Sequence, residues 1–258
     1  MATITASGAA LGATVTDVDL RESLDEPAIA ELRQALLTHE VLIFPDQGLS
    51  PAEQVRFGES FGQLEVHAVL DRDDELPEVV VMDTAEGAPT AEWWHTDVTC
   101  SAEPPLGVIL QIVIAAPSGG ATHWASMTAA YDALDDPTKH QIAALSARHE
   151  SWWKPVEEAV HPVVRQHPES GRTGLFVNGI FTKEIVEASP DGSDALLDRL
   201  VEHATRDEFT WHHEWSSGDI AFWDNRVTQH RVDADFGDAR RRGHRIAIEG
   251  DRPVAPRP

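Results

Sequence analysis

The chain has 258 residues and a formal net charge of −24, with 41% hydrophobic and 25% charged residues. This acidic balance argues against nucleic acid as a partner, because binding to phosphates needs a basic surface, and against an anionic membrane surface. The length predicts a single domain over residues 1–258.

The composition also predicts a cytoplasmic protein. Cys100 is the single cysteine, so no internal disulfide can form, as is usual in a reducing compartment. The first twenty residues lack the basic start and the continuous apolar stretch of a signal peptide. The sequence contains no run of about 18 apolar residues, so no membrane span is expected.

The predicted elements start with a short strand in residues 1–20 and continue with a helix over residues 26–39, where apolar residues recur at helical spacing. Residues 41–46 (VLIFPD) are typical of a strand. Residues 50–53 (SPAE) form a capping-box pattern with proline at the first helical position, which predicts a helix to about Phe61.

Short strand patterns, rich in β-branched and aromatic residues and separated by Gly and Pro, dominate the rest of the chain. Helical patterns interrupt them near residues 126–147 and 193–205, and HPESGRTG (167–174) predicts a hairpin turn. This order favours a mainly β barrel or sandwich with flanking helices over a regular βαβ alternation. The predicted strands are 78–83, 107–115, 161–167, 173–178, 209–215, 219–224 and 244–250.

Among 13 histidines, the segment Trp94-His95-Thr96-Asp97 is the best candidate for a metal site. Alternate residues of a strand point to the same face, so we expect His95 and Asp97 to project together into the barrel. One imidazole, one carboxylate and a distant second histidine make the facial triad of iron(II) oxygenases, which leaves coordination positions open. Two near-copies of the motif, His167–Glu169 and His212–Glu214, are interpreted as a solvated turn and a half-exposed strand pair.

The C-terminal segment supplies the remaining parts of such a site. His230 follows a predicted strand and a tight turn, and clustered arginines come after it. A cationic group near an iron site can pair with the far carboxylate of a dicarboxylate co-substrate. Arg241 and Arg245 share one face if this segment is extended, whereas we expect Arg240 and Arg242 to be solvated.

These motifs, taken in order, resemble those of the taurine dioxygenase (TauD/TfdA) family of 2-oxoglutarate-dependent dioxygenases. The resemblance covers nearly the whole chain and is carried by HEVLIFPDQGLSPAEQVRFGESFG, WHTD, PSGGATHWAS, WDNRVTQH and RRGHRIAIEGDRP. It implies a double-stranded β-helix (jelly roll) with flanking helices. It also implies Fe(II) as the metal, with 2-oxoglutarate and O2 as co-substrates.

Carried over residue by residue, the resemblance implies a role for six side chains. In its iron site, 2-oxoglutarate chelates the metal and is oxidatively decarboxylated to succinate and CO2, while an unactivated C–H of a small organic substrate is hydroxylated. Iron is bound by His95, Asp97 and His230; Thr122 hydrogen-bonds the 2-oxoglutarate; and Arg241 and Arg245 pair with its carboxylates.

The substrate positions depart from those of the taurine enzymes. His67 matches a histidine that contacts the sulfonate there, and Phe181 matches an aromatic substrate contact. Leu70 stands where a tyrosine is expected, and Ala91 where an asparagine is expected. Because two polar contacts are replaced, we expect a larger or more apolar substrate than taurine.

Several tryptophans and the residues before His230 lie near these motifs. Trp152 and Trp153 lie where the family has a mobile lid, and together with Trp93 they could add aromatic surface to the pocket. Asp224 and Asn225 are expected to fix the turn before His230 rather than to touch the substrate. The sequence leaves a homo-oligomer open.

Three alternatives to hydroxylation remain. A zinc hydrolase or lyase could use the same ligands, since zinc also accepts two histidines and a carboxylate, but Arg241 and Arg245 would then have no role. A non-catalytic metal-binding jelly roll would be favoured by the loss of a ligand, and none is lost. Within the family, the same chemistry could cleave a sulfate ester or an aryloxy ether, or desaturate, whereas halogenation requires that Asp97 be missing.

Overall fold

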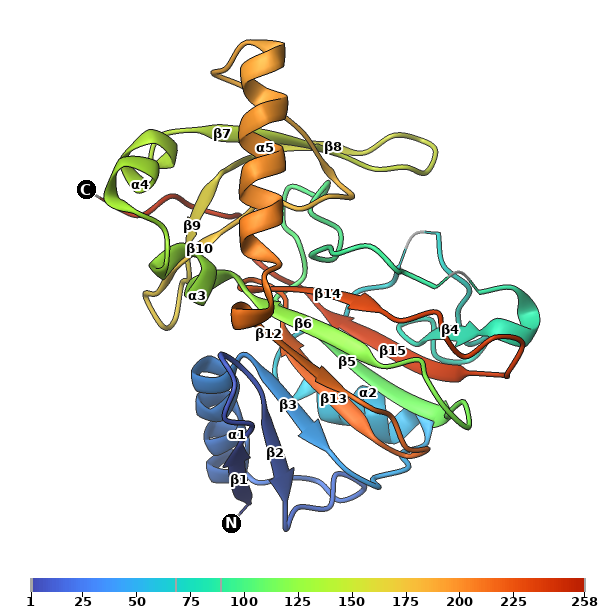
Figure 1. Cartoon of the computed structure of the whole chain (residues 1–258). Coiled ribbons are helices and arrows are strands. Elements are labelled where there is room, and N and C mark those ends of the chain that lie inside the picture. The colour runs from blue at the N-terminus through green and yellow to red at the C-terminus, as the bar shows by residue number, and fades with distance from the viewer. Residues whose placement is uncertain (1, 68, 89, 258) are drawn as a thin grey trace.

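Two mainly antiparallel sheets that face each other form the centre of the computed structural model, which describes residues 2–67, 69–88 and 90–257 (Figure 1). Met1 and Pro258, the two ends of the predicted domain, lie outside the described residues, as does Ala68 of the FGQLEVHAVL segment. The larger sheet has the order β1 (Thr3–Ala6), β2 (Ala13–Thr16), β3 (Val41–Phe44), β13 (Ile220–Asp224), β5 (Gly107–Ile114), β15 (Arg242–Ile248) and β4 (Val80–Asp83). The smaller sheet has the order β12 (Thr210–His213), β6 (Thr122–Ser126) and β14 (Thr228–Val232).

The helices and the remaining strands surround this pair of sheets. The helices are α1 (Glu26–His39), α2 (Pro51–Glu59), α3 (Met127–Asp132), α4 (Asp136–Ile142) and α5 (Pro190–Ala204), with single 3₁₀ turns at Thr84–Glu86 and Asp207–Phe209. A third sheet consists of β11 (Thr182–Ile185), β7 (Ser146–Glu150) and β8 (Glu158–Pro162), and β9 (Val164–Gln166) pairs with β10 (Thr173–Leu175) as a hairpin. No helix of the described ranges is long and apolar enough to cross a membrane.

Tryptophans fill the space between the two central sheets. Trp124 on β6 is fully buried and lies 6.0 Å from Trp211 on β12 and 5.9 Å from Trp223 on β13, measured between ring centroids. Burial of a large apolar side chain contributes about 1.5–3 kcal/mol each, so this layer binds the smaller sheet to the larger one.

Helices α1 and α2 cover the outer face of the larger sheet. Asp25 caps α1 by accepting a hydrogen bond from the Ala28 main chain at 2.9 Å. Ser50 and Glu53 form the predicted capping box at the start of α2. Phe57 of α2 then packs edge to face against Phe222 of β13, with ring centroids 6.3 Å apart.

The predicted fold class, mainly β with flanking helices in a double-stranded β-helix, is confirmed by this arrangement. Several boundaries differ from the prediction, among them the following three. Helix α2 ends at Glu59 rather than at Phe61, and the helical pattern near 126–147 is two short helices followed by the start of β7. The predicted strand 161–167 is divided between the end of β8 and the whole of β9.

The buried carboxyl group of Glu40 should make stability depend on pH near neutrality. Glu40 is 2% exposed and accepts hydrogen bonds from Thr128 and Arg172, but burial raises its pKa from 4.5 to about 7. Because the folded pKa lies above the unfolded value, this contribution is complete below about pH 4.5 and is lost as the pH rises through about 7. We expect Glu40→Gln to lessen the fall in Tm across that range, measured by thermal unfolding. A Tm that falls as steeply in the variant would contradict this assignment.

Candidate metal centre and substrate cavity

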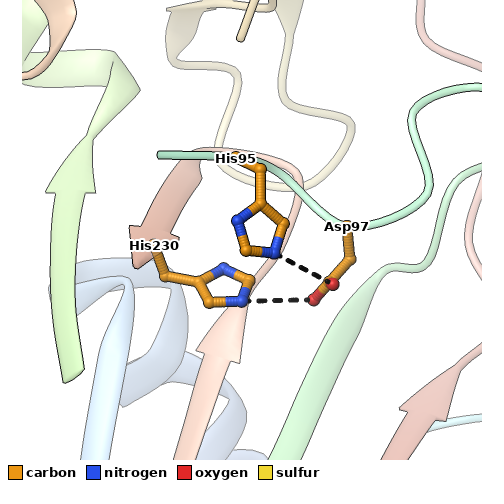
Figure 2. Close-up of side chains that lie close together, drawn as sticks. All are labelled: His95, Asp97 and His230. Carbon is orange, nitrogen blue, oxygen red and sulfur yellow. Dashed lines mark ion pairs between the residues drawn. The ribbon is translucent and has the colours of Figure 1, made fainter. Parts of the chain in front are cut away.

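His95, Asp97 and His230 converge at one end of the barrel, and their candidate ligand atoms all lie within 4.8 Å of one another. His95 Nε2 lies 3.7 Å from Asp97 Oδ1, and His230 Nε2 lies 3.8 Å from Asp97 Oδ2 (Figure 2). His230 belongs to β14, whereas His95 and Asp97 precede β5. The donor set of two imidazoles and one carboxylate fits a divalent metal such as iron.

The prediction that His95 and Asp97 share a strand is wrong. His95 pairs with His230 as an isolated bridge, with main-chain hydrogen bonds of 3.0 and 2.7 Å, and Asp97 begins a turn. In this turn Val98 has a φ of 51°, in the left-handed region that β-branched residues rarely adopt. The bridge sets the two imidazole rings side by side, and the turn brings the carboxylate back to face them.

The protonation states of the cluster suit metal binding. His95 Nδ1 lies 2.8 Å from the Trp93 carbonyl oxygen, which can only accept, so this nitrogen carries the proton and Nε2 is left free. Burial, and then the nearby His95, lowers the pKa of His230 to about 3, so its ring is neutral. Burial alone would raise the pKa of Asp97, but Arg245 and the two histidines lower it well below its ordinary value. The neutral imidazole of His230 and the ionised carboxylate of Asp97 therefore face each other at neutral pH.

The cluster lies in the wall of a cavity of about 220 Å³. The same cavity is lined by each of the eight side chains selected from the sequence, although they come from six different parts of the chain. They are His67, His95, Asp97, Thr122, Phe181, His230, Arg241 and Arg245.

One part of the cavity wall is cationic. Arg241, just before β15, is 8% exposed, and its Nη2 atom has no hydrogen-bond partner among the described residues. Burial lowers its pKa to about 10, so it stays charged at neutral pH. Arg245, on β15, lies 3.0 Å from Asp97 Oδ2 through its Nη2 atom. The Thr122 hydroxyl accepts a hydrogen bond from Trp215 Nε1 at 2.9 Å, which leaves its own proton free to donate.

The arginines on either side of Arg241 lie nearer to solvent, as predicted. The side chains of Arg240 and Arg242 are 47% and 37% exposed. Arg240 also donates to the buried carboxylate of Asp83, at 2.5 and 3.1 Å, which the sequence did not suggest. This ion pair fixes the loop that leads into Arg241.

The opposite wall is largely apolar. Leu70 and Ala91, the two replaced positions, both line the cavity. Phe181 is buried, its main chain donates to Asn178 Oδ1 at 2.8 Å, and its ring lies 5.9 Å from that of Trp153. The other apolar lining residues include Val69, Val98, Trp152, Ile180 and Trp223.

His67 gives this apolar wall a polar group. Its Nδ1 atom accepts from the Leu70 main chain at 3.2 Å and from that of Val69 at 3.3 Å, so Nε2 carries the proton of the neutral ring. Burial, and then the charge of Arg245, lowers the pKa of His67 to about 4. His67 is thus a neutral hydrogen-bond donor at physiological pH.

Two interpretations from the sequence are wrong. Trp93 is 63% exposed and does not line the cavity. His167, interpreted as part of a solvated turn, is 2% exposed and lies 2.9 Å from Asp224 Oδ2. Trp223 of β13 lines the cavity but was not selected, because its pattern was that of any buried strand tryptophan.

The amino-acid sequence matches the model of the family described as "Taurine catabolism dioxygenase TauD, TfdA family" over residues 3–247. The alpha-ketoglutarate-dependent sulfate ester dioxygenase of Pseudomonas putida is 34% identical to it, over 95% of this chain and 88% of its own. A taurine dioxygenase from Burkholderia xenovorans has a crystal structure with a TM-score of 0.92 and 39% identity, over 99% of this chain and 91% of its own. The crystal structure of AAD-2 in complex with Mn(II) and N-oxalylglycine has a TM-score of 0.84 and 28% identity, over 99% of this chain and 100% of its own.

The chain therefore belongs to the TauD/TfdA family. It is an oxidoreductase, a 2-oxoglutarate-dependent dioxygenase, and the predicted set of Fe(II), 2-oxoglutarate and O2 is confirmed as that of its class. Two histidines, a carboxylate and a buried arginine whose Nη2 atom has no partner in the described part of the chain lie in one cavity, and these residues fit this set.

Proposed function

We propose that this chain, as one domain, hydroxylates an unactivated C–H of a small organic substrate that has an apolar body and is not taurine. His95, Asp97 and His230 would hold Fe(II), which supplies the activation of dioxygen when bound. Arg241, Arg245 and Thr122 would then bind 2-oxoglutarate, as the resemblance to the family implies: Arg241 and Arg245 through its carboxylates, and Thr122 through a hydrogen bond.

The observation that carries this proposal is the position of Arg241. A charged guanidinium that is 8% exposed and has a nitrogen without a partner in residues 2–67, 69–88 and 90–257 is costly unless an anion pairs with it. This group lines the same cavity as the metal cluster. A dicarboxylate held at the metal by one end would present its other carboxylate to such a group, and a planar guanidinium can accept it through two parallel hydrogen bonds.

The walls of the cavity support the substrate class. Leu70 and Ala91 offer no hydrogen bond, and Phe181 and Trp153 present aromatic surface. His67 Nε2–H is available as a donor to one acceptor group of a substrate. We infer a substrate with a single polar or anionic group and a hydrocarbon body, which the apolar wall would shield from water.

A second candidate function uses the same site. Hydroxylation of the carbon next to an ester oxygen gives an unstable product that separates into an aldehyde and a free sulfate, so a sulfate ester would be cleaved rather than hydroxylated. The similarity to the Pseudomonas putida protein named as a sulfate ester dioxygenase supports this variant.

The assignment of the residues that bind Fe(II) and 2-oxoglutarate is tested under anaerobic conditions. Apoprotein is mixed with Fe(II) and 2-oxoglutarate, and a weak visible charge-transfer band is expected, which His230→Ala should remove. Absence of the band in folded, iron-loaded protein would overturn the assignment of these residues.

The substrate proposal is then tested by the release of succinate under air. We expect alkyl sulfate esters or other apolar monoanions to stimulate succinate release, and taurine to leave it at the basal rate. Stimulation by taurine at the level of an apolar substrate would refute the inference from Leu70 and Ala91.

A further inference from the structure

The turn that carries Asp97 is bound by a side chain from a distant part of the chain. Asn225, which is 1% exposed, lies in the turn between β13 and β14. Its Oδ1 accepts a hydrogen bond from the Asp97 main-chain N–H at 2.9 Å. Its Nδ2 donates to the carbonyl oxygens of Asp97 and Pro105, both at 3.1 Å. One amide therefore binds both polar groups of the Asp97 main chain.

The geometry of this turn is unfavourable by itself. Val98, the next residue, is β-branched and has a φ of 51°. Such a conformation persists only where the surrounding structure holds it. Two of the three side-chain hydrogen bonds of Asn225 act on Asp97, the residue directly before the strained one, so they are placed to hold it.

Asn225 is itself fixed by its neighbours. Its main-chain N–H donates to the Leu106 carbonyl at 3.0 Å. The adjacent carboxylate of Asp224 is fully buried, and it accepts hydrogen bonds from Arg226 at 2.6 Å and from His167 at 2.9 Å. The amide thus projects from a buried ion network and has little freedom to follow a moving turn.

We propose that Asn225 is a positioning residue for the metal carboxylate. By holding the Asp97 peptide group, it sets the direction of the Asp97 side chain, whose oxygens lie 3.7 and 3.8 Å from the two imidazoles. This role goes beyond fixing the turn before His230, and it rests on the proposed metal-binding role of Asp97. Partners that orient metal ligands in this way typically contribute about 10–100-fold to metal affinity.

Asn225→Asp is the variant that isolates this role. It keeps the shape of the side chain and the acceptor for the Asp97 N–H, and it loses the two donated hydrogen bonds. The added negative charge would by itself attract a cation, so weaker metal binding would report the position of Asp97. Asn225→Ser, which adds no buried charge, takes its place if the first variant is unfolded.

Gln111→Glu provides a matched control. Gln111 is 2% exposed, and it binds the main chain of Leu49 in the same manner, accepting from its N–H at 2.5 Å and donating to its carbonyl at 2.8 Å. Neither Gln111 nor Leu49 lines the cavity. Both variants therefore weaken a buried amide that is hydrogen-bonded to the main chain of another segment. Asn225 lies beside the metal cluster, and Gln111 lies away from it.

The measurement is the affinity of the apoprotein for Mn(II) alone, by electron paramagnetic resonance of the free ion, together with the Tm. Both variants should lower the Tm, and only Asn225→Asp should weaken Mn(II) binding, by about 10–100-fold. Unchanged affinity in Asn225→Asp, or an equal loss in Gln111→Glu, would overturn the positioning role while leaving the proposed function intact. If Asp97→Ala binds Mn(II) as tightly as the wild-type protein does, this result would overturn the proposed function as well.

Discussion

Asp97→Ala is expected to weaken metal affinity by more than about 100-fold, because even a partner that only orients a metal ligand contributes about 10–100-fold. It should abolish the 2-oxoglutarate-dependent release of succinate with it. Asp97 supplies the negative charge of the cluster, and both of its oxygens face an imidazole Nε2 atom. Titration with Mn(II) and assay of succinate measure the two effects separately.

The variant also leaves Arg245, 3.0 Å from Asp97 Oδ2, without its partner, so some loss of stability is expected. Asp97→Asn, which keeps the size of the side chain, should show the same loss of metal with a smaller change in Tm. Glu214→Ala is the control, since Glu214 is the exposed acid of a near-copy of the motif and does not line the cavity. Turnover retained in both Asp97 variants would refute the proposed metal site.

Arg241→Gln is expected to raise the KM for 2-oxoglutarate by about 30-fold or more. Removing one member of a buried, hydrogen-bonded charge pair costs about 2–5 kcal/mol, and 2 kcal/mol corresponds to about 30-fold. No hydrogen bond or ion pair joins Arg241 to the metal cluster among the described residues, so Mn(II) affinity should change little. Initial rates over a range of 2-oxoglutarate concentrations give the KM.

Two further variants separate charge from geometry. Arg241→Lys keeps a positive charge but not the planar fork, so its KM should lie between those of wild type and Arg241→Gln. Arg240→Gln removes the neighbouring arginine, which pairs with Asp83 and does not line the cavity, and should raise the KM much less than Arg241→Gln does. An unchanged KM in Arg241→Gln would show that the co-substrate carboxylate is bound elsewhere.

Much of the local structure could be predicted from the sequence because the physical causes are themselves local. The apolar spacing of residues 26–39 defines α1, and the capping box at Ser50 defines the start of α2. Both depend on contacts between residues three or four positions apart. The eight candidate site residues could be selected because their motifs, in order, resemble those of one family, and all eight line one cavity.

The tertiary structure alone decided how those residues are held. His95 and Asp97 reach the same point through a bridge to β14 and a strained turn, and this turn depends on Asn225, which lies 128 positions further along the chain. The burial of His167 was also beyond prediction, because it occurs in a stretch as polar as any surface turn and is yet enclosed. Local spacing determines which face a side chain occupies, but whether that face meets solvent, a carboxylate or an open cavity depends on elements that fold against it from elsewhere in the chain.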